Sequence, residues 1–293
     1  GDAGVRARPG VGRATRRAGT LGAPVPGIDG ALRALASLDA LAARPGPAAR
    51  LDARAKLLVT AAYILAVVSF ERHAVAALVP FAAYPLLLGA WAQVPAGPIL
   101  RKLALASPFA LMVGAFNPWI DTAPMLQLGS LSVSSGWVSY ASLLLRFVLT
   151  VSAALLLVAT TGMRELAAAL GALGVPREFT AQLLFLHRYS FVVGEEARRM
   201  ATAARLRSAG RGLKLGAWSA LLGHLLLRAY ERARRIHQAM LARGYDGELR
   251  PGRPLAWQGR DTLFVMAWLV VFAWWRWGEP VAGLGRLLTG SGA

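Results

Sequence analysis

Five long apolar segments constrain the fold of this chain more than any other feature. They are Leu57–Phe70, Ala74–Ala92, Leu103–Trp119, Tyr140–Met163 and Thr262–Trp277. A membrane-spanning helix needs about 20 mainly apolar residues, and the second and fourth segments meet this length unaided. The other three need flanking residues or a thin, tilted arrangement. Buried helices of a soluble protein are the competing interpretation, but five such segments in one chain favour membrane insertion.

Charge is segregated between these segments. The net charge is +18, although only 16% of the residues are charged. Lys and Arg number ten in residues 1–56, two in 93–102, none in 120–139 and seventeen in 164–260. Because basic loops stay on the cytoplasmic side, this pattern predicts an orientation. We expect an all-α membrane protein with about five transmembrane helices, a cytoplasmic N-terminus and a long cytoplasmic helical insert before the last span.

The chain is expected to have four parts. These are a basic, disordered N-terminal arm at 1–30, four transmembrane helices within 51–163, a cytoplasmic helical region at 164–260 and a fifth transmembrane helix at 261–280. The arm is rich in Gly and Arg and lacks the apolar run of a signal peptide. Its charge agrees with the positive-inside pattern, so it requires no nucleic-acid partner.

Arg146 is a charged residue inside the fourth apolar segment. A long basic side chain in a span extends to the membrane surface or pairs with an acidic group. We expect Arg146 to reach the outer surface. Asp121 or a partner subunit is the alternative contact.

The cytoplasmic region is predicted to be helical. A short helix over Met163–Leu173 is followed by two long ones, from about Arg177 to Arg207 and from about Leu215 to Arg243. Apolar and small residues step by three and four along both long helices, which predicts a packing seam on each. The seam residues are Phe179, Leu183, Leu186, Ser190, Val193, Ala197, Met200 and Ala204 on the first helix, and Trp218, Leu222, Leu225, Ala229, Ala233, Ile236 and Met240 on the second.

Both long helices end with the same chemistry. The first ends in Arg205-Leu206-Arg207-Ser208-Ala209-Gly210 and the second in Leu241-Ala242-Arg243-Gly244. An arginine favours the negative end of the helix dipole and a glycine supplies a left-handed cap, so capping is the simplest interpretation. The repetition at two exposed helix ends predicts a second role, as binding points on the cytoplasmic face.

Several kinds of chemistry find no support in the sequence. There is no cysteine, no phosphate-binding loop and no His-Glu-x-x-His pair, so thiol chemistry, direct ATP binding and a chelated metal site are not expected. The apolar segments almost lack carboxylates, which disfavours a self-powered transporter. Glu195 and Glu196 are adjacent and point about 100° apart on a helix, a poor catalytic pair. We expect a non-enzymatic chain without a cofactor.

Three stretches resemble the EcfT component of energy-coupling factor transporters, most closely its CbiQ type from cobalt and nickel uptake systems. Leu51-Asp52-Ala53-Arg54-Ala55-Lys56-Leu57 is similar to the family's Leu-Asp-Pro-Arg-x-Lys-Leu, with Ala53 in place of proline. Arg205–Ser208 and Leu241–Gly247 resemble its two short Arg-centred motifs. In the first motif Ser208 stands where glycine is common, so its central arginine is either Arg207 or Arg205.

The resemblance implies a transmembrane scaffold in a bacterial inner membrane. Its partners would be two ABC-type ATPases, which bind the ATP, and a substrate-binding integral membrane subunit of the CbiM or NikM kind. The implied substrate is cobalt or nickel, with vitamins as the other class handled by such transporters. Docking would use two crossed helix tips that move together as the ATPases close. The implied docking residues are Arg207, Arg243, Arg205, Ser208, Ala242 and Gly244.

Two other functions remain open on the sequence alone. A membrane-anchored assembly protein could use the basic insert to bind anionic lipid or nucleic acid, with effects graded over many arginines. A membrane enzyme would need an acid–base pair or a nucleophile in a cytoplasmic pocket, and the sequence offers only the poor pair described above.

Overall fold

The computed structural model describes residues 28–43, 46–71, 74–116, 124–128, 131–208, 214–246 and 255–278. The chain divides into two compact units. Residues 1–36 and 181–249 form the first, here the helix-pair unit, and residues 37–180 and 250–293 form the second, here the span unit. Most of the expected N-terminal arm lies outside the described residues. Its last residues begin a helix, α2 (Ile28–Ala42), that the sequence analysis did not predict.

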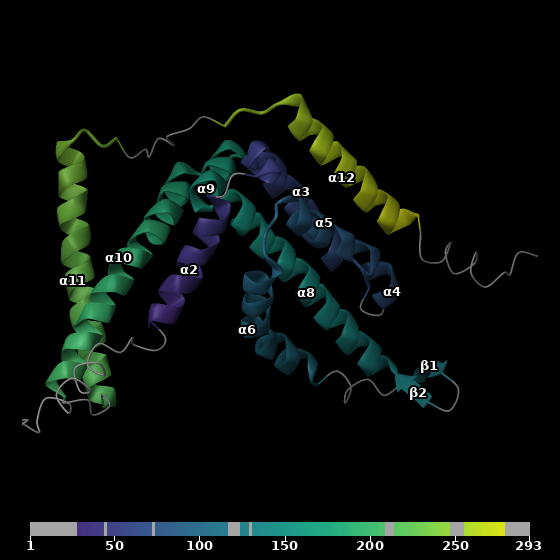
Figure 1. The fold of residues 1–293 in the computed structure, drawn as a ribbon, viewed down its shortest axis with the longest axis horizontal. Helices are drawn as coiled ribbons and strands as arrows, with labels where there is room; N and C mark the ends of the chain where they lie inside the picture. The colour runs from purple at the N-terminus through teal and green to yellow at the C-terminus, as the bar shows by residue number, and fades with distance from the viewer. Residues whose placement is uncertain are drawn as a thin grey trace, which may run out of the picture. The chain divides into compact units, whose positions relative to one another are not determined.

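The span unit consists of helices and one small hairpin (Figure 1). Its elements after α2 are η1 (Pro47–Arg50), α3 (Ala53–Val68), α4 (Val75–Leu78), η2 (Pro80–Ala82), α5 (Ala83–Trp91), α6 (Ala96–Gly114), β1 (Pro124–Leu128), β2 (Leu131–Ser134), α8 (Ser135–Thr161), α9 (Met163–Ala172) and α12 (Gly259–Trp277). Helix α3 packs against α8, α9 and α12, and α8 also packs against α5 and α6. The all-α membrane class is confirmed, with the hairpin as a small addition.

An aromatic cluster forms the core of the span unit. Tyr63 of α3 lies 4.6 Å from Tyr84 of α5 and 5.5 Å from Phe272 of α12, between ring centroids. The polar ends of both tyrosines are satisfied within the core. The Tyr63 hydroxyl donates to the carbonyl oxygen of Phe81 at 3.0 Å, and the Tyr84 hydroxyl lies 2.8 Å from that of Thr60. Buried tyrosines with bonded hydroxyls fix the relative positions of these helices.

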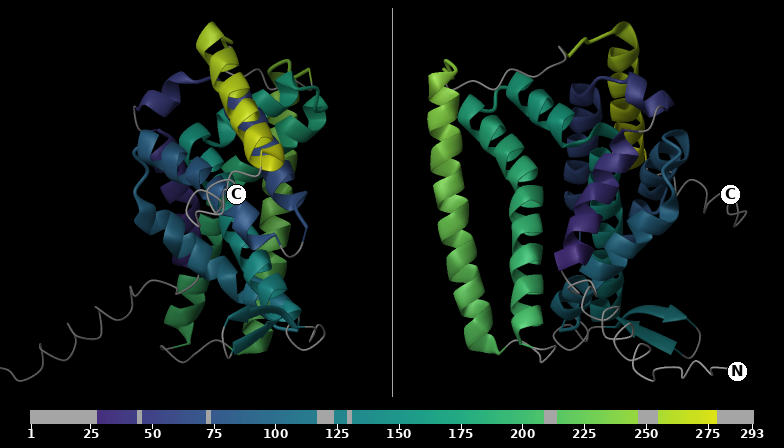
Figure 2. Two further views of the ribbon diagram at one scale, coloured as in Figure 1. Left: turned by 90° about the vertical axis from the view of Figure 1, so that its right-hand side faces the viewer. Right: turned by 60° about the vertical axis from the view of Figure 1, so that its left-hand side comes forward.

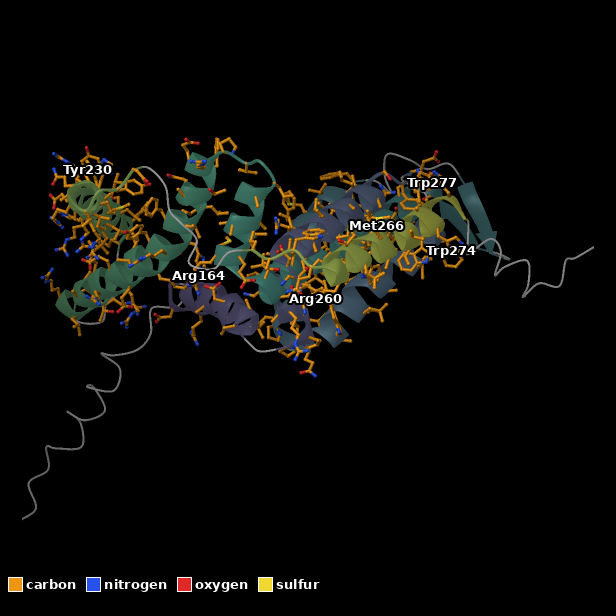
Figure 3. The ribbon with its side chains drawn as sticks, turned by 90° about the horizontal axis from the view of Figure 1, so that it is seen from above. Arg164, Tyr230, Arg260, Met266, Trp274 and Trp277 are labelled. Carbon is orange, nitrogen blue, oxygen red and sulfur yellow. The ribbon has the colours of Figure 1, made fainter. Side chains whose placement is uncertain are left out.

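Large apolar side chains also cover the outside of the span unit. Leu105 of α6 is 81% exposed, and Leu65 of α3 and Leu86 of α5 are almost as open. Along α12, the side chains of Met266, Trp274 and Trp277 are exposed as well (Figure 3). A soluble protein rarely exposes so much large apolar surface, whereas a bilayer solvates it.

Two helices among the described residues, α6 and α8, are long and apolar enough to cross a membrane. Residues Val75–Trp91 form a shorter apolar stretch, divided where Pro80 and Pro85 stand at the first turns of η2 and α5. Proline is tolerated in a first turn but cannot continue a preceding helix. Helices α3 and α12, of 16 and 19 residues, do not meet the same test. The number of spans beyond two therefore stays a prediction.

Helix α6 differs from the predicted third segment at both ends. It begins at Ala96 rather than Leu103, so Arg101 and Lys102 lie within the helix, and it ends at Gly114. A Cβ atom at Gly114 would lie 2.5 Å from the ring of Tyr140. The glycine is therefore required by the close approach of α6 to α8.

The hairpin was not predicted. Strand β1 pairs with β2 in antiparallel register, from Leu128 opposite Leu131 to Pro124 opposite Ser134, with an irregularity after Pro124. Residues 120–139 lie between the third and fourth apolar segments and were expected to form a connection only. The alternation Leu131-Ser132-Val133-Ser134 is a strand signal that was overlooked.

Arg146 reaches the end of α3. Its guanidinium donates a hydrogen bond to the carbonyl oxygen of Glu71, three residues after Val68, the last residue of that helix. Its Nε atom and the hydroxyls of Ser139 and Ser142, which share a face of α8, are buried and have no hydrogen-bond partner among the described residues. The alternative partner Asp121 lies outside the described residues.

Candidate functional site

The helix-pair unit is dominated by two long helices that run in opposite directions, α10 (Arg177–Arg207) and α11 (Leu215–Ala242) (Figure 2). Their bounds agree with the predicted ones to within one residue. Gly174, with a φ of +97°, and Pro176 separate α10 from the preceding helix. The two long helices are joined through residues 208–214, so the end of α10 lies near the start of α11.

An ion pair joins the two helices. Arg228 of α11 donates to Glu196 of α10 at 2.5 Å. Further along α10, Arg198 binds Glu195 through two hydrogen bonds of 2.9 and 2.6 Å and lies 3.9 Å from Asp29 of α2. The hydrogen bond from Arg198 lowers the pKa of Glu195 to about 2, and the same contact raises the pKa of Arg198.

The predicted seam is only partly correct. In the second half of α11, Ala229, Ile236 and Met240 are half-buried as expected, whereas Ala233 is exposed. In the first half, Trp218 and Leu222 are 36% and 63% exposed. There, Leu225 is half-buried as predicted, together with Ala217 and Leu221, which were not predicted. On α10, Phe179 and Leu186 are exposed rather than on a buried seam. A straight helix has 3.6 residues per turn, so a seam drawn with a heptad spacing drifts across its surface.

A cleft of about 270 Å³ lies between α10 and α11. Its apolar lining residues are half-buried, and its charged lining residues, apart from Glu196, are exposed. The lining residues are Val192, Val193, Glu196, Leu225, Arg228, Ala229, Glu231, Arg232 and Arg235. The Glu196–Arg228 ion pair lies in this wall, so part of the charge that lines the cleft is already neutralised.

The end of α10 presents its two arginines differently. Arg207 is exposed, whereas Arg205 is half-buried. The Ser208 hydroxyl donates to the carbonyl oxygen of Arg205 at 2.9 Å, and the Ser208 amide donates to Ala204 at 3.0 Å. Serine therefore caps the last turn through its side chain. The predicted glycine cap at Gly210 lies outside the described residues.

The end of α11 is a glycine cap of the Schellman type. Gly244 has a φ of +80°, and its amide donates to the carbonyl oxygen of Leu241 at 3.0 Å. The amide of Tyr245 donates to Met240 at 3.0 Å. This pair of bonds defines the motif and confirms the predicted left-handed cap. It leaves Arg243 exposed at the helix end, directly after Ala242.

The two tips lie at opposite ends of the antiparallel pair. Helix α11 has 28 residues, which correspond to about 42 Å at 1.5 Å per residue. Arg207 is close to the start of that length and Arg243 is at its end. The structure therefore does not bring the two arginines together. Within the described part of the chain, neither guanidinium forms a hydrogen bond or ion pair.

Three residues in the span unit received no role from the sequence. Asp52, Lys56 and Asp261 are buried charged groups, and Asp261 is fully buried in the first turn of α12. The signal for Asp261 was a Gln258-x-x-Asp261 spacing before an apolar run, which is a capping-box pattern. Among the described residues, no group of three or more His, Cys, Asp or Glu side chains is arranged to hold a metal ion.

Comparison with known protein families shows which family this chain belongs to. The profile of the family described as cobalt transport protein CbiQ matches residues 46–254, which include α3 and both helix tips. The chain belongs to this family.

Two curated proteins are similar to parts of this CbiQ-family chain. The cobalt transport protein CbiQ of Rhodobacter capsulatus is 38% identical over 96 residues, which are 32% of this chain and 39% of that protein. An uncharacterized protein of Methanocaldococcus jannaschii is 33% identical over 102 residues, which are 34% of this chain and 38% of that protein. The matched stretches thus span about two fifths of each relative.

Proposed function

We propose that this chain is the transmembrane coupling subunit of an ATP-driven importer of the energy-coupling factor kind. In this proposal, α10 and α11 are coupling helices on the cytoplasmic face of a bacterial inner membrane, and all five apolar segments span the bilayer. Two ABC-type ATPases bind ATP and dock one at each tip. A separate CbiM- or NikM-like membrane subunit binds the substrate, cobalt or nickel, and this chain transfers the work of ATP hydrolysis to it.

The separation of the two tips is the observation that carries the proposal. Arg207 and Arg243 are exposed at helix ends about 42 Å apart, a separation suited to two bodies bound side by side. A guanidinium is always charged and offers several donors, so a carboxylate or carbonyl groove on a partner can bind it with defined geometry. Because Arg207 is exposed and Arg205 is half-buried, we assign the first docking role to Arg207.

Charge reversal at the tips tests the proposal. Arg207→Glu and Arg243→Glu should each weaken co-purification of the ATPases, with an affinity loss of about 30-fold or more, and should abolish uptake of cobalt or nickel in membrane vesicles. Arg234→Glu is the matched control, because Arg234 is exposed on α11 away from the tip. Arg205→Glu tests the alternative register of the first motif.

The competing lipid-binding or nucleic-acid-binding function predicts a different pattern. There, Arg234→Glu would weaken binding as much as Arg207→Glu, and added salt would reduce all variants alike. That outcome, or ATPase association that survives both tip reversals, would refute the coupling function.

A further inference from the structure

Three charged side chains are buried in the span unit where α3 and α12 begin. Asp261 is 0% exposed, Lys56 is 1% exposed and Asp52 is 7% exposed. Burying a charge is costly unless it is paired and hydrogen-bonded. The bonds that these groups make therefore show which elements they hold together.

Asp261 connects the start of α12 to the start of α3. Its Oδ1 atom accepts a hydrogen bond from the backbone amide of Asp52 at 2.9 Å, across 209 residues of sequence. Its Oδ2 atom accepts from the amide of Gln258 at 2.8 Å, as part of the capping box of α12. One carboxylate thus caps the start of α12 and holds Asp52, the residue that precedes α3.

Asp52 in turn caps α3 and binds Arg54. Its Oδ1 atom accepts from the Arg54 amide at 2.8 Å, and its two oxygens accept from the guanidinium at 3.1 Å each. Burial acts to raise the pKa of Asp52, but the side-chain and backbone hydrogen bonds from Arg54 outweigh it and hold the pKa below its usual value. The guanidinium also stacks over Trp257, just before α12, at 5.5 Å from the ring centroid.

Lys56 connects α3 to the break between α8 and α9. Its ammonium donates to the carbonyl oxygen of Thr160 at 2.9 Å, in the last turn of α8. Gly162 follows with a φ of +76°, which ends α8 and redirects the chain into α9. Helix α9 packs against α3. Lys56 thus fixes the end of α8, where the chain turns into α9, to α3.

We infer that Asp52, Lys56 and Asp261 are positioning residues that form a joint, at which the chain segments of both coupling helices are fastened to α3. Helix α10 follows α9 along the chain, and α11 precedes α12. The Lys56 bond fastens the first segment and the Asp261 bond the second. The inference rests on the proposed function, because it assigns these bonds the task of passing displacements of α10 and α11 into the spans together.

The test uses the assembled complex in vesicles and compares uptake with ATP hydrolysis. Lys56→Met replaces the buried charge with an apolar side chain of similar length. Such replacements are often tolerated in a buried site, so the variant is expected to fold. Asp261→Asn retains the side-chain volume but loses one of two acceptors, so one of the two amides is left unbound. Lys214→Met and Glu178→Gln are the controls, since both residues are exposed.

Lys56→Met and Asp261→Asn should each lower uptake per ATP hydrolysed by roughly 2- to 30-fold, while ATPase association and both controls stay at the wild-type level. In the purified chain without its partners, amide hydrogen exchange should be faster than in the wild type in α9 for Lys56→Met and in the first turn of α12 for Asp261→Asn. An unchanged uptake-to-hydrolysis ratio in Lys56→Met would overturn the joint. Failure of the wild-type chain to bind ATPases would instead refute the proposed function, and the hydrogen-exchange comparison would still test the bonds.

Discussion

Glu196 and Arg228 join α10 to α11 at 2.5 Å, across 32 residues of sequence. The pair is asymmetric, since the Glu196 side chain is 20% exposed and that of Arg228 is 64% exposed. It is a charge contact between the two helices that carry the proposed docking tips. The contribution of this ion pair to stability determines how firmly α10 and α11 are held together.

Exchanging the two charges should show that this contact is specific. Glu196→Arg alone places like charges opposite each other and should destabilise the helix pair by about 1 kcal/mol, whereas Glu196→Arg combined with Arg228→Glu should recover most of that loss. The thermal unfolding midpoint of the purified chain, followed by circular dichroism, measures both. Equal midpoints for the single and double variants would show that the pair contributes nothing.

Gly244 and Gly223 offer a matched comparison of two glycines. Neither would bring a Cβ atom within 4 Å of any neighbour, but only Gly244 has a positive φ. Gly244→Ala should therefore cost about 1 kcal/mol through the left-handed backbone, and Gly223→Ala, inside α11, should gain about 0.5–1 kcal/mol. Chemical denaturation of the two variants measures the difference. A loss of stability in both would mean that the cap is not what requires Gly244.

Gly114 tests how closely α6 approaches α8. A Cβ atom there would lie 2.5 Å from the Tyr140 ring, so Gly114→Ala should destabilise the span unit by about 1–3 kcal/mol. Removing the ring should relieve this clash, so Gly114→Ala with Tyr140→Leu should be less destabilised than the sum of the two single changes. Thermal unfolding in detergent provides the comparison. Strict additivity would show that the helices separate there without cost.

The Glu195–Arg198 contact predicts an acid dependence for α10. Glu195 has a pKa of about 2 in the folded chain, below the value of about 4.3 for an unfolded glutamate. Its stabilising contribution is therefore complete above about pH 4.3 and is lost as the pH falls towards 2. Hydrogen exchange of α10 amides, compared between wild type and Glu195→Gln over this range, should converge at the acid end. Glu231→Gln is the control, because its contact with Arg235 is long, at 3.9 Å.

The cytoplasmic helices were predictable because their signals are local. Three-and-four periodicity predicted α10 and α11, and the stop at Gly174 and Pro176 predicted the end of α9, all to within one residue at each end. The left-handed cap at Gly244 follows from the same kind of signal. Helix α2 was missed because the Gly/Arg-rich stretch before it dominated the interpretation of the N-terminus.

Features that depend on distant contacts were not predictable. The bond between Asp261 and Asp52 joins residues 209 apart, and no periodic pattern indicates that the two helix starts meet. The seam error at Trp218 and Leu222 has a related cause, because the face that a helix buries depends on where its neighbour crosses it. The sequence identified the two tips as helix ends, and the exposure of Arg207 relative to Arg205 required the structure.

The direction of α11 limits the motion that docked partners can drive. Arg207 ends α10 beside the start of α11, and Arg243 lies at the far end of the 28-residue α11. The two tips therefore stay about one helix length apart as long as α11 is intact and paired with α10. Two ATPases that close on ATP would therefore be bound to docking points whose separation is fixed by the helix pair. In the proposed coupling function, the closing ATPases would then rotate the helix pair about its midpoint instead of drawing its two ends together, so the membrane helices would receive a torque.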